Sequence, residues 1–332
     1  MTTKLLIDSV SKLYGAQYAV RDFSLSVAEG EFVSLLGPSG SGKSTVLSMI
    51  AGLNRPSAGR ILIDGTDVTN LPANRRNIGL VFQNYALFPH QTVARNVAFP
   101  LKVRSLPEVE IAERVAEALR KVRLEPFAER YPDELSGGQQ QRAALARAIV
   151  FEPDLLLLDE PLGALDRRLR ESLRHELRSL QRQTGITTIM VTHDQEEALS
   201  MSDTIVVMSG GRAEQCAAPE ELYMRPQSRF VAEFIGSANV VPGDALAPGD
   251  PAALFAIRPE AVRFHSAPAS EGALTGTVNA TEYCGNYYRL YLSVDKVGEM
   301  TSHLQLAHPP SLGSQGYVSW SQADMHPLRH PA

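Results

Sequence analysis

Cysteine is scarce in this chain, because only Cys216 and Cys284 occur among its 332 residues. They lie far apart and lack the spacing of metal ligands, so we interpret both as structural or incidental. Long apolar runs are also missing, and none approaches the roughly 18 to 20 residues of a membrane span. The first residues lead directly into a strand-like segment without the apolar core of a signal peptide, so we expect the protein to remain in the cytosol.

Neither sign of charge is in large excess. The chain has 32 Lys and Arg residues against 37 Asp and Glu residues, a formal net charge of −5. This balance argues against general affinity for nucleic acid and leaves room only for a local basic surface. With 44% hydrophobic and 21% charged residues, the chain has the composition of an ordinary globular protein that is long enough for two domains.

Glycine is concentrated in a short segment near the N-terminus that we call the phosphate loop. It consists of Gly37, Pro38, Ser39, Gly40, Ser41, Gly42, Lys43, Ser44 and Thr45. A strand-like apolar run precedes it and a helical pattern follows, which is the context that G-x-x-x-x-G-K-[ST] requires. Glycines let backbone N–H groups converge on phosphates at a helix N-terminus. Lys43 can then reach the β- and γ-phosphates and Ser44 can bind Mg²⁺, so the loop predicts nucleotide binding rather than a chance turn.

Two further candidates follow predicted strands of the same sheet. The run 155–158 is continuously apolar, as in a buried parallel strand, and Asp159 and Glu160 come directly after it. Carboxylates at this edge of an α/β sheet can hold Mg²⁺ and polarise an attacking water, whereas the alternative is a solvated acidic turn. His193 follows the strand 187–191; it is either a surface or capping group or a sensor of the γ-phosphate.

Two residues have both a plain and a functional interpretation. Tyr14 lies in a predicted turn, where it is either a packing residue or the flat surface on which adenine stacks. Gln83 follows the predicted strand 78–82; it either caps the strand end or belongs to the joint formed by the loop after it. The segment 85–89 is rich in aromatic residues and proline and is expected to join two subdomains.

A helical insert is predicted between about residue 92 and residue 124, before a second glycine-containing helix start. That start consists of Ser136, Gly137, Gly138 and Gln139. It is either an N-cap and turn or a second phosphate-binding helix N-terminus, which a second chain would supply. The next predicted helix has a leucine stripe over 165–180, and its arginines are expected to form a solvated or docking face.

The composition changes after about residue 236. A linker is expected up to about residue 243, and short strand-like runs follow at 254–257, 287–292 and 317–320. Several short strands with glycine turns predict a small all-β barrel.

These motifs have the order and spacing of an ATP-binding-cassette (ABC) ATPase, which residues 3–236 resemble. The matching motifs are the phosphate loop, Gln83, residues 135–139, residues 155–160, residues 164–166 with Asp166, and His193. The segments 89–90, 220–223, 230–236 and 257–260 are similar to importer ATPases that carry a C-terminal β domain. Gln91 and the pair Ala217-Ala218 depart from the family pattern without touching these motifs.

The resemblance implies an α/β P-loop NTPase fold over 1–236, with an antiparallel β subdomain and a helical subdomain at about 88–140, and an OB-like TOBE domain over 237–332. It implies a homodimer that encloses two ATP molecules with Mg²⁺, in which Lys43 and Ser44 of one copy face Ser136 and Gly138 of the other. Glu160 would be the base and His193 the γ-phosphate sensor. The implied Mg²⁺ ligands are Ser44, Asp159 and Gln83; the implied nucleotide contacts include Tyr14, Gly137, Gln139 and Asp166.

The resemblance also implies partners and a place in the cell. A membrane permease would dock near residues 83–90 and the helical subdomain, a solute-binding protein would act indirectly, and the ATPase would lie on the cytoplasmic face of the inner membrane. The ending 319–326 is most similar to polyamine-type members, with ferric iron, phosphonate and sulfate or thiosulfate as alternative cargoes. A non-transport ABC ATPase is disfavoured because the chain has one cassette and only about 90 residues between Lys43 and Ser136, too few for a long coiled-coil insertion.

Overall fold

The chain forms two compact units, residues 1–219 and 220–332. The computed structural model describes residues 2–163, 166–245, 250, 252–267, 273–305 and 308–329. Ala164 and Leu165, which belong to a predicted motif and to the leucine stripe, lie outside the described residues. The predicted domain boundary at 236/237 stays a prediction; in the structure the helices just before it belong to the second unit.

An antiparallel sheet opens the first unit. Its strands are β1 (Thr3–Tyr14), β2 (Gln17–Ala28), β4 (Ala58–Ile63) and β5 (Thr66–Asp67), in the order β2-β1-β4-β5. The alternation predicted for β2 is present, because Phe23, Leu25 and Val27 are buried while the residues between them are exposed. One face of this sheet therefore packs into a core.

A six-stranded sheet carries the predicted motifs. It contains β3 (Phe32–Leu36), β6 (Ile78–Val81), β7 (Leu155–Asp159), β8 (Thr187–Thr192), β9 (Thr204–Ser209) and β10 (Arg212–Ala217), in the order β10-β9-β3-β8-β7-β6. All neighbouring strands are parallel except β10, which is antiparallel to β9. In register, Leu36 is opposite Thr192 and Asp159 is opposite Val191. The phosphate loop, the two carboxylates and His193 thus leave the sheet at one edge.

Both faces of this sheet are covered, which explains its continuous apolar strands. Along β7, Leu155 and Leu157 pack into the core shared with α1 and the antiparallel sheet, whereas Leu156 and Leu158 pack into the core shared with the helical group. Alternate side chains of one strand point to opposite faces, so β7, which is covered on both faces, is apolar at each position from Leu155 to Leu158.

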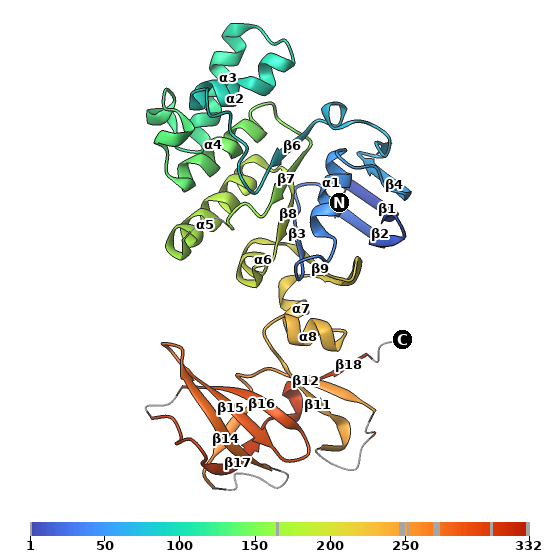
Figure 1. The fold of residues 1–332 in the computed structure, drawn as a ribbon, viewed down its shortest axis with the longest axis vertical. Helices are drawn as coiled ribbons and strands as arrows, with labels where there is room; N and C mark the ends of the chain where they lie inside the picture. Colours follow the sequence, from blue (N-terminus) through green and yellow to red (C-terminus); the bar gives the residue numbers. More distant parts are fainter. Residues whose placement is uncertain are drawn as a thin grey trace. The chain divides into compact units, whose positions relative to one another are not determined.

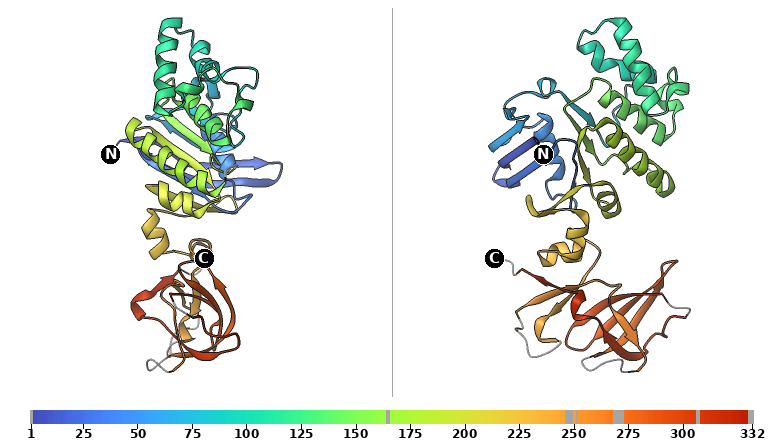
Figure 2. Two further views of the ribbon diagram at one scale, coloured as in Figure 1. Left: turned by 90° about the vertical axis from the view of Figure 1, so that its left-hand side faces the viewer. Right: turned by 180° about the vertical axis from the view of Figure 1, so that it is seen from behind.

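The helices of the first unit fall into two sets. Around the sheet lie α1 (Lys43–Ala51), α5 (Arg167–Thr184), α6 (Gln195–Met201) and the short η1 (Ala73–Arg75). The helical group contains α2 (Val93–Val103), α3 (Glu108–Lys121), α4 (Gly137–Ile149), η2 (Glu125–Phe127) and η3 (Pro132–Glu134). Figures 1 and 2 show α2, α3 and α4 gathered together, away from β1, β2 and β4. No helix in the described part of the chain is long and apolar enough to cross a membrane.

The second unit begins with α7 (Pro219–Met224) and α8 (Arg229–Phe234), and its remaining structure is mainly strands. These are β11 (Asn239–Pro242), β12 (Leu254–Ile257), β13 (Arg263–His265), β14 (Leu274–Tyr283), β15 (Tyr288–Val294), β16 (Gly298–Leu304), β17 (Gln315–Ser319) and β18 (Met325–Leu328), with the short turns η4 (Gly243–Ala245) and η5 (Gln322–Asp324). The prediction of an all-β region is confirmed. The strands form two sheets, β11-β12-β18 and β13-β17-β14-β15-β16, rather than the predicted single barrel.

Candidate active site

The phosphate loop connects β3 to α1 and passes close to neighbouring backbone. A Cβ added at Gly37 would lie 2.3 Å from the carbonyl oxygen of Met208, and one added at Gly42 would lie 2.5 Å from that of Ala19. Gly42 also has a φ of +100°, which favours glycine, and it caps α1 without a side-chain hydrogen bond. The first N–H groups of α1 therefore remain available to an anion at the loop.

Lys43 is buried within this loop, with an exposed fraction of 5%. Its Nζ donates hydrogen bonds to the carbonyl oxygens of Gly37, at 2.8 Å, and Pro38, at 2.9 Å. Burial lowers the pKa of Lys43, while the negative charges of Glu160 and Asp159 act to raise it. A cation thus lies within the phosphate loop, where it can attract phosphate oxygens.

Asp159 ends β7 and faces the start of α1. The Ser44 hydroxyl donates a hydrogen bond of 3.3 Å to Oδ1 of Asp159. Burial raises the pKa of Asp159, the bond from Ser44 opposes this, and the charge of Glu160 adds to it. Magnesium prefers a few oxygen ligands and retains water, so this hydroxyl–carboxylate pair fits a Mg²⁺ ion bound to a phosphate.

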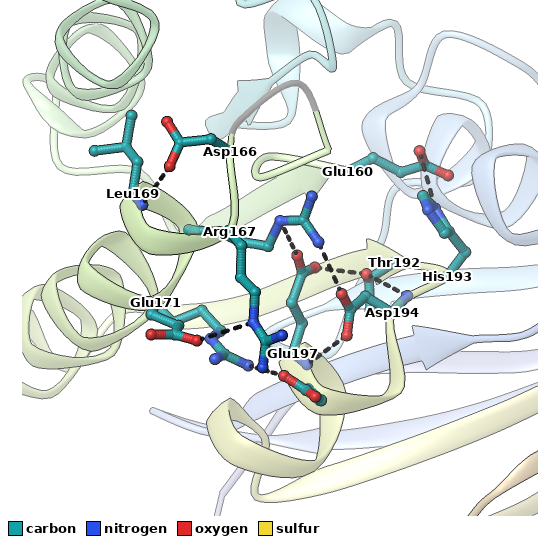
Figure 3. A network of polar contacts seen from close by, with 12 residues as sticks. Glu160, Asp166, Arg167, Leu169, Glu171, Thr192, His193, Asp194 and Glu197 are labelled. Carbon is teal, nitrogen blue, oxygen red and sulfur yellow. Dashed lines mark hydrogen bonds and ion pairs between the residues drawn. The ribbon is translucent and has the colours of Figure 1, made fainter. Parts of the chain in front are cut away.

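Glu160 directs its side chain toward two residues that follow other strands. Gln83 Nε2 donates a hydrogen bond of 3.2 Å to Oε2 of Glu160. His193 Nδ1 lies 3.3 Å from the same oxygen (Figure 3). The backbone of Glu160 has a φ of +43°, in the left-handed region, and its N–H donates to Val191 O at 3.0 Å. Such strain in a non-glycine residue concentrates at functional sites.

These residues surround a cavity of about 480 Å³. It is lined by Ala19, Ser39, Gly40, Gly42, Lys43, Ser44, Thr45, Glu160 and His193. The sequence predicted all of these except Ala19, an unremarkable residue of β2 that no motif could have identified. The volume and the polar lining suit a nucleoside triphosphate.

The remaining predicted residues do not line this cavity. Ser136 caps α4, since its Oγ accepts from Gln139 N at 3.4 Å and Gln139 Oε1 accepts from Ser136 N at 2.9 Å. Asp166 caps α5 by accepting from Leu169 N at 3.0 Å (Figure 3). Gly137 and Gly138 form the first turn of α4.

Tyr14 also lies outside the cavity lining. It is the last residue of β1 rather than part of a turn, because it pairs with Gln17 across the hairpin. Its side chain is half exposed, and Lys12 Nζ lies 5.2 Å from the centre of its ring. A ring that is accessible on one face remains able to stack on a base.

Known proteins resemble this chain over its length. A family model for "ABC transporter" matches residues 20–163 and one for "TOBE domain" matches residues 255–328. The chain is 46% identical over 323 residues to "Spermidine/putrescine import ATP-binding protein PotA" of Bacillus thuringiensis (strain Al Hakam), covering 96% of this chain and 97% of that protein. A protein of the same name from Methylococcus capsulatus is 45% identical over 344 residues, covering 94% and 89%.

A solved structure supports the same assignment. The dimeric structure of a post-hydrolysis state of the ATP-binding cassette MJ0796, bound to ADP and Pi, is 36% identical with a TM-score of 0.58, and it covers 65% of this chain and 98% of that chain. With the phosphate loop, the paired carboxylates and His193 at one sheet edge, the chain belongs to the ABC transporter family, as an ATP-hydrolysing cassette followed by a TOBE domain.

Proposed function

We propose that this chain is the ATPase subunit of an importer for polyamines of the spermidine and putrescine type. The observation that carries this proposal is the 46% identity that extends over 96% of the chain to a relative named for spermidine and putrescine import. The similarity includes the C-terminal region as well as the cassette. This agrees with the resemblance of residues 319–326 to polyamine-type importer ATPases.

The proposed reaction is attack of water on the γ-phosphate of ATP. Glu160 accepts the proton of the attacking water, and its carboxylate is oriented by Gln83 and His193. Lys43 and the loop amides bind the phosphate oxygens and stabilise the charge that develops on them. Ser44, Asp159 and Gln83 would hold Mg²⁺, which supplies further neutralisation of phosphate charge when bound.

We also propose that two copies complete each site. Ser136, Gly137, Gly138 and Gln139 open α4 and do not line the cavity of their own chain, so a second copy would present this helix N-terminus to the nucleotide. Asp166 would act near the same interface, and Tyr14 would stack on adenine. A permease would dock at residues 83–90 and the helical subdomain, which places the ATPase peripherally on the cytoplasmic face of the membrane.

The proposal is tested by purifying the tagged protein from detergent-solubilised membranes of its own source and reconstituting the recovered complex in vesicles. We expect a multi-span permease to co-purify and labelled spermidine to be transported only when ATP is hydrolysed, with Lys43→Ala as the inactive control. Recovery of a permease whose binding protein takes sulfate, phosphonate or ferric iron would contradict the assignment of polyamines as the transported solute. Recovery of no membrane partner would overturn the transport role and leave the ATPase intact.

A further inference from the structure

The arginines of α5, which were predicted to form a solvated or docking face, divide into two groups: Arg167 and Arg168 are exposed, whereas three others pair with carboxylates. Arg170 pairs with Asp194 and Glu197, Arg174 Nη1 lies 3.5 Å from Glu196 Oε2, and Arg178 pairs with Asp203. We call Arg170, Arg174 and Arg178 the arginine ladder. They recur every four residues, so they lie on one side of α5, which they attach to α6 and the residues beside it.

Arg170 is the member of the ladder nearest to the active site. Its Nη1 donates a hydrogen bond of 3.1 Å to Asp194 Oδ2, and its Nε lies 3.8 Å from Glu197 Oε1. The side chain of Arg170 is 30% exposed, whereas that of Glu197 is only 3% exposed. A pair with one fully buried member is screened much less by water than a surface pair, so it constrains the geometry more strongly.

The two carboxylates that Arg170 contacts fix the backbone on both sides of His193. Asp194 caps α6 by accepting from Glu197 N at 3.1 Å. Thr192 Oγ1 donates to Glu197 Oε2 at 2.6 Å and accepts from Asp194 N at 3.0 Å. Figure 3 shows Thr192, Asp194 and Glu197 as a connected group, with His193 extending from it toward Glu160.

We propose that Arg170 is a positioning residue for His193, holding the 192–194 turn in the geometry that brings the imidazole to Glu160. The proposal rests on the function proposed above, in which His193 and Glu160 act on ATP. Arg170 contacts Asp194 and Glu197 and acts on His193 through these two carboxylates. Because Arg170 lies four residues after Asp166, it also couples the start of α5 to the His193 turn.

The charge balance of this group supports the proposal. Burial raises the pKa of Glu197, whereas Arg170 and the hydrogen bond from Thr192 oppose that rise. Without Arg170, Glu197 would keep a buried carboxylate with one hydroxyl partner, and protonation or rearrangement of the turn would relieve it. Either change alters the contacts of Thr192 and Asp194, which flank His193.

The first test compares Arg170→Gln and Arg170→Lys with Arg167→Gln in the full-length protein. Arg167 is a matched control on the same turn of α5, where it forms an exposed pair with Glu171 in which its side chain is 86% exposed. We expect kcat for ATP hydrolysis to fall roughly 10- to 100-fold in Arg170→Gln with KM for ATP unchanged, since a small misplacement of a catalytic group has effects of this order. Arg170→Lys should recover part of the loss, and Arg167→Gln should match the wild type.

The second test asks whether Arg170 acts through His193. Single-turnover hydrolysis is measured for Arg170→Gln, His193→Ala and the double variant. We expect the double variant to be no slower than His193→Ala alone. Once the imidazole is absent, loss of the residue that positions it should have no further effect on the rate. Glu197→Gln, which keeps the group hydrogen-bonded while removing its charge, repeats the cycle if Arg170→Gln folds poorly.

The outcomes separate the two claims. Losses that add in the double variant, or an Arg170→Gln effect confined to KM or to thermal stability, would overturn the positioning role and leave the function proposed for His193 standing. Wild-type turnover in His193→Ala would overturn the role of His193 itself, and the positioning role with it.

Discussion

Nδ1 of His193 lies 3.3 Å from Oε2 of Glu160, the same oxygen that accepts a hydrogen bond from Gln83. The imidazole follows β8, the carboxylate follows β7, and the amide lies just beyond β6. The ends of three parallel strands therefore orient one carboxylate oxygen. If Glu160 is the base, as proposed above, this arrangement reduces the reorganisation that the reaction requires.

Gly42→Ala should abolish tight ATP binding. Gly42 has a φ of +100°, and a Cβ there would lie 2.5 Å from Ala19 O, so the loop must shift. Gly65→Ala is the control, since Gly65 has a φ of +73° with nothing within 4 Å of an added Cβ. Both changes carry the left-handed penalty of about 1–2 kcal/mol, but only Gly42→Ala moves the phosphate site. Calorimetric titration with ATP checks this, and wild-type affinity in Gly42→Ala would contradict the loop assignment.

Tyr14→Ala should weaken ATP binding about 3- to 10-fold, because an aromatic stacking contact contributes about 0.5–1.5 kcal/mol. Tyr14→Phe should bind as the wild type does, and Tyr18→Ala is a matched control, because Tyr18 is a similarly exposed tyrosine on β2. Inorganic tripolyphosphate has no base, so its affinity should be the same in all three variants. A Tyr14→Ala protein that loses affinity for tripolyphosphate as well would show that Tyr14 shapes the loop rather than contacting adenine.

The sequence predicted the parts of the site that local patterns determine. The spacing from Gly37 to Ser44 encodes a loop whose backbone geometry is fixed by its own glycines, and the apolar run before Asp159 identifies a buried strand. Both signals arise from residues that are close together in the chain. The loop and the strand could therefore be predicted without knowledge of the packing.

Contacts between distant residues were not predictable in the same way. Arg170 and Asp194 are 24 residues apart, and their pairing depends on the angle at which α5 crosses α6. Tyr14 ends a strand because Gln17 pairs with it, whereas the local sequence indicated a turn. In each case the deciding interaction comes from another element, which a local pattern does not contain.

Arg258→Met should destabilise the second unit by about 3 kcal/mol, because buried carbonyl groups lose charged donors. Arg258 is 8% exposed, and it donates to Tyr223 O at 2.7 Å and to Ala232 O at 3.3 Å. Ile235 O accepts a further bond from the same guanidinium. One side chain thus joins α7 and α8 to the start of the β region.

Urea unfolding of the full-length protein, followed by the fluorescence of Trp320, measures this effect because Trp320 is the single tryptophan and lies in the second unit. Arg263→Met is the control, since Arg263 is exposed and its side chain donates a hydrogen bond of 2.8 Å to Glu260 O. Equal stabilities of the two variants would show that Arg258 does not hold this unit together.

Glu160→Gln should separate ATP binding from hydrolysis. The amide keeps the size of the carboxylate and an oxygen that can accept from Gln83, so ATP affinity should be unchanged, but the amide cannot take a proton from water. We expect turnover to fall about 10²- to 10⁴-fold, as for loss of a general base, and ATP-bound dimers to accumulate in size-exclusion chromatography. Lys43→Ala is the contrasting variant, because it removes the cation that contacts the loop carbonyls and should lose ATP affinity and the dimer together. Near-normal hydrolysis by Glu160→Gln would remove Glu160 as the base and leave Asp159 as the carboxylate to test next.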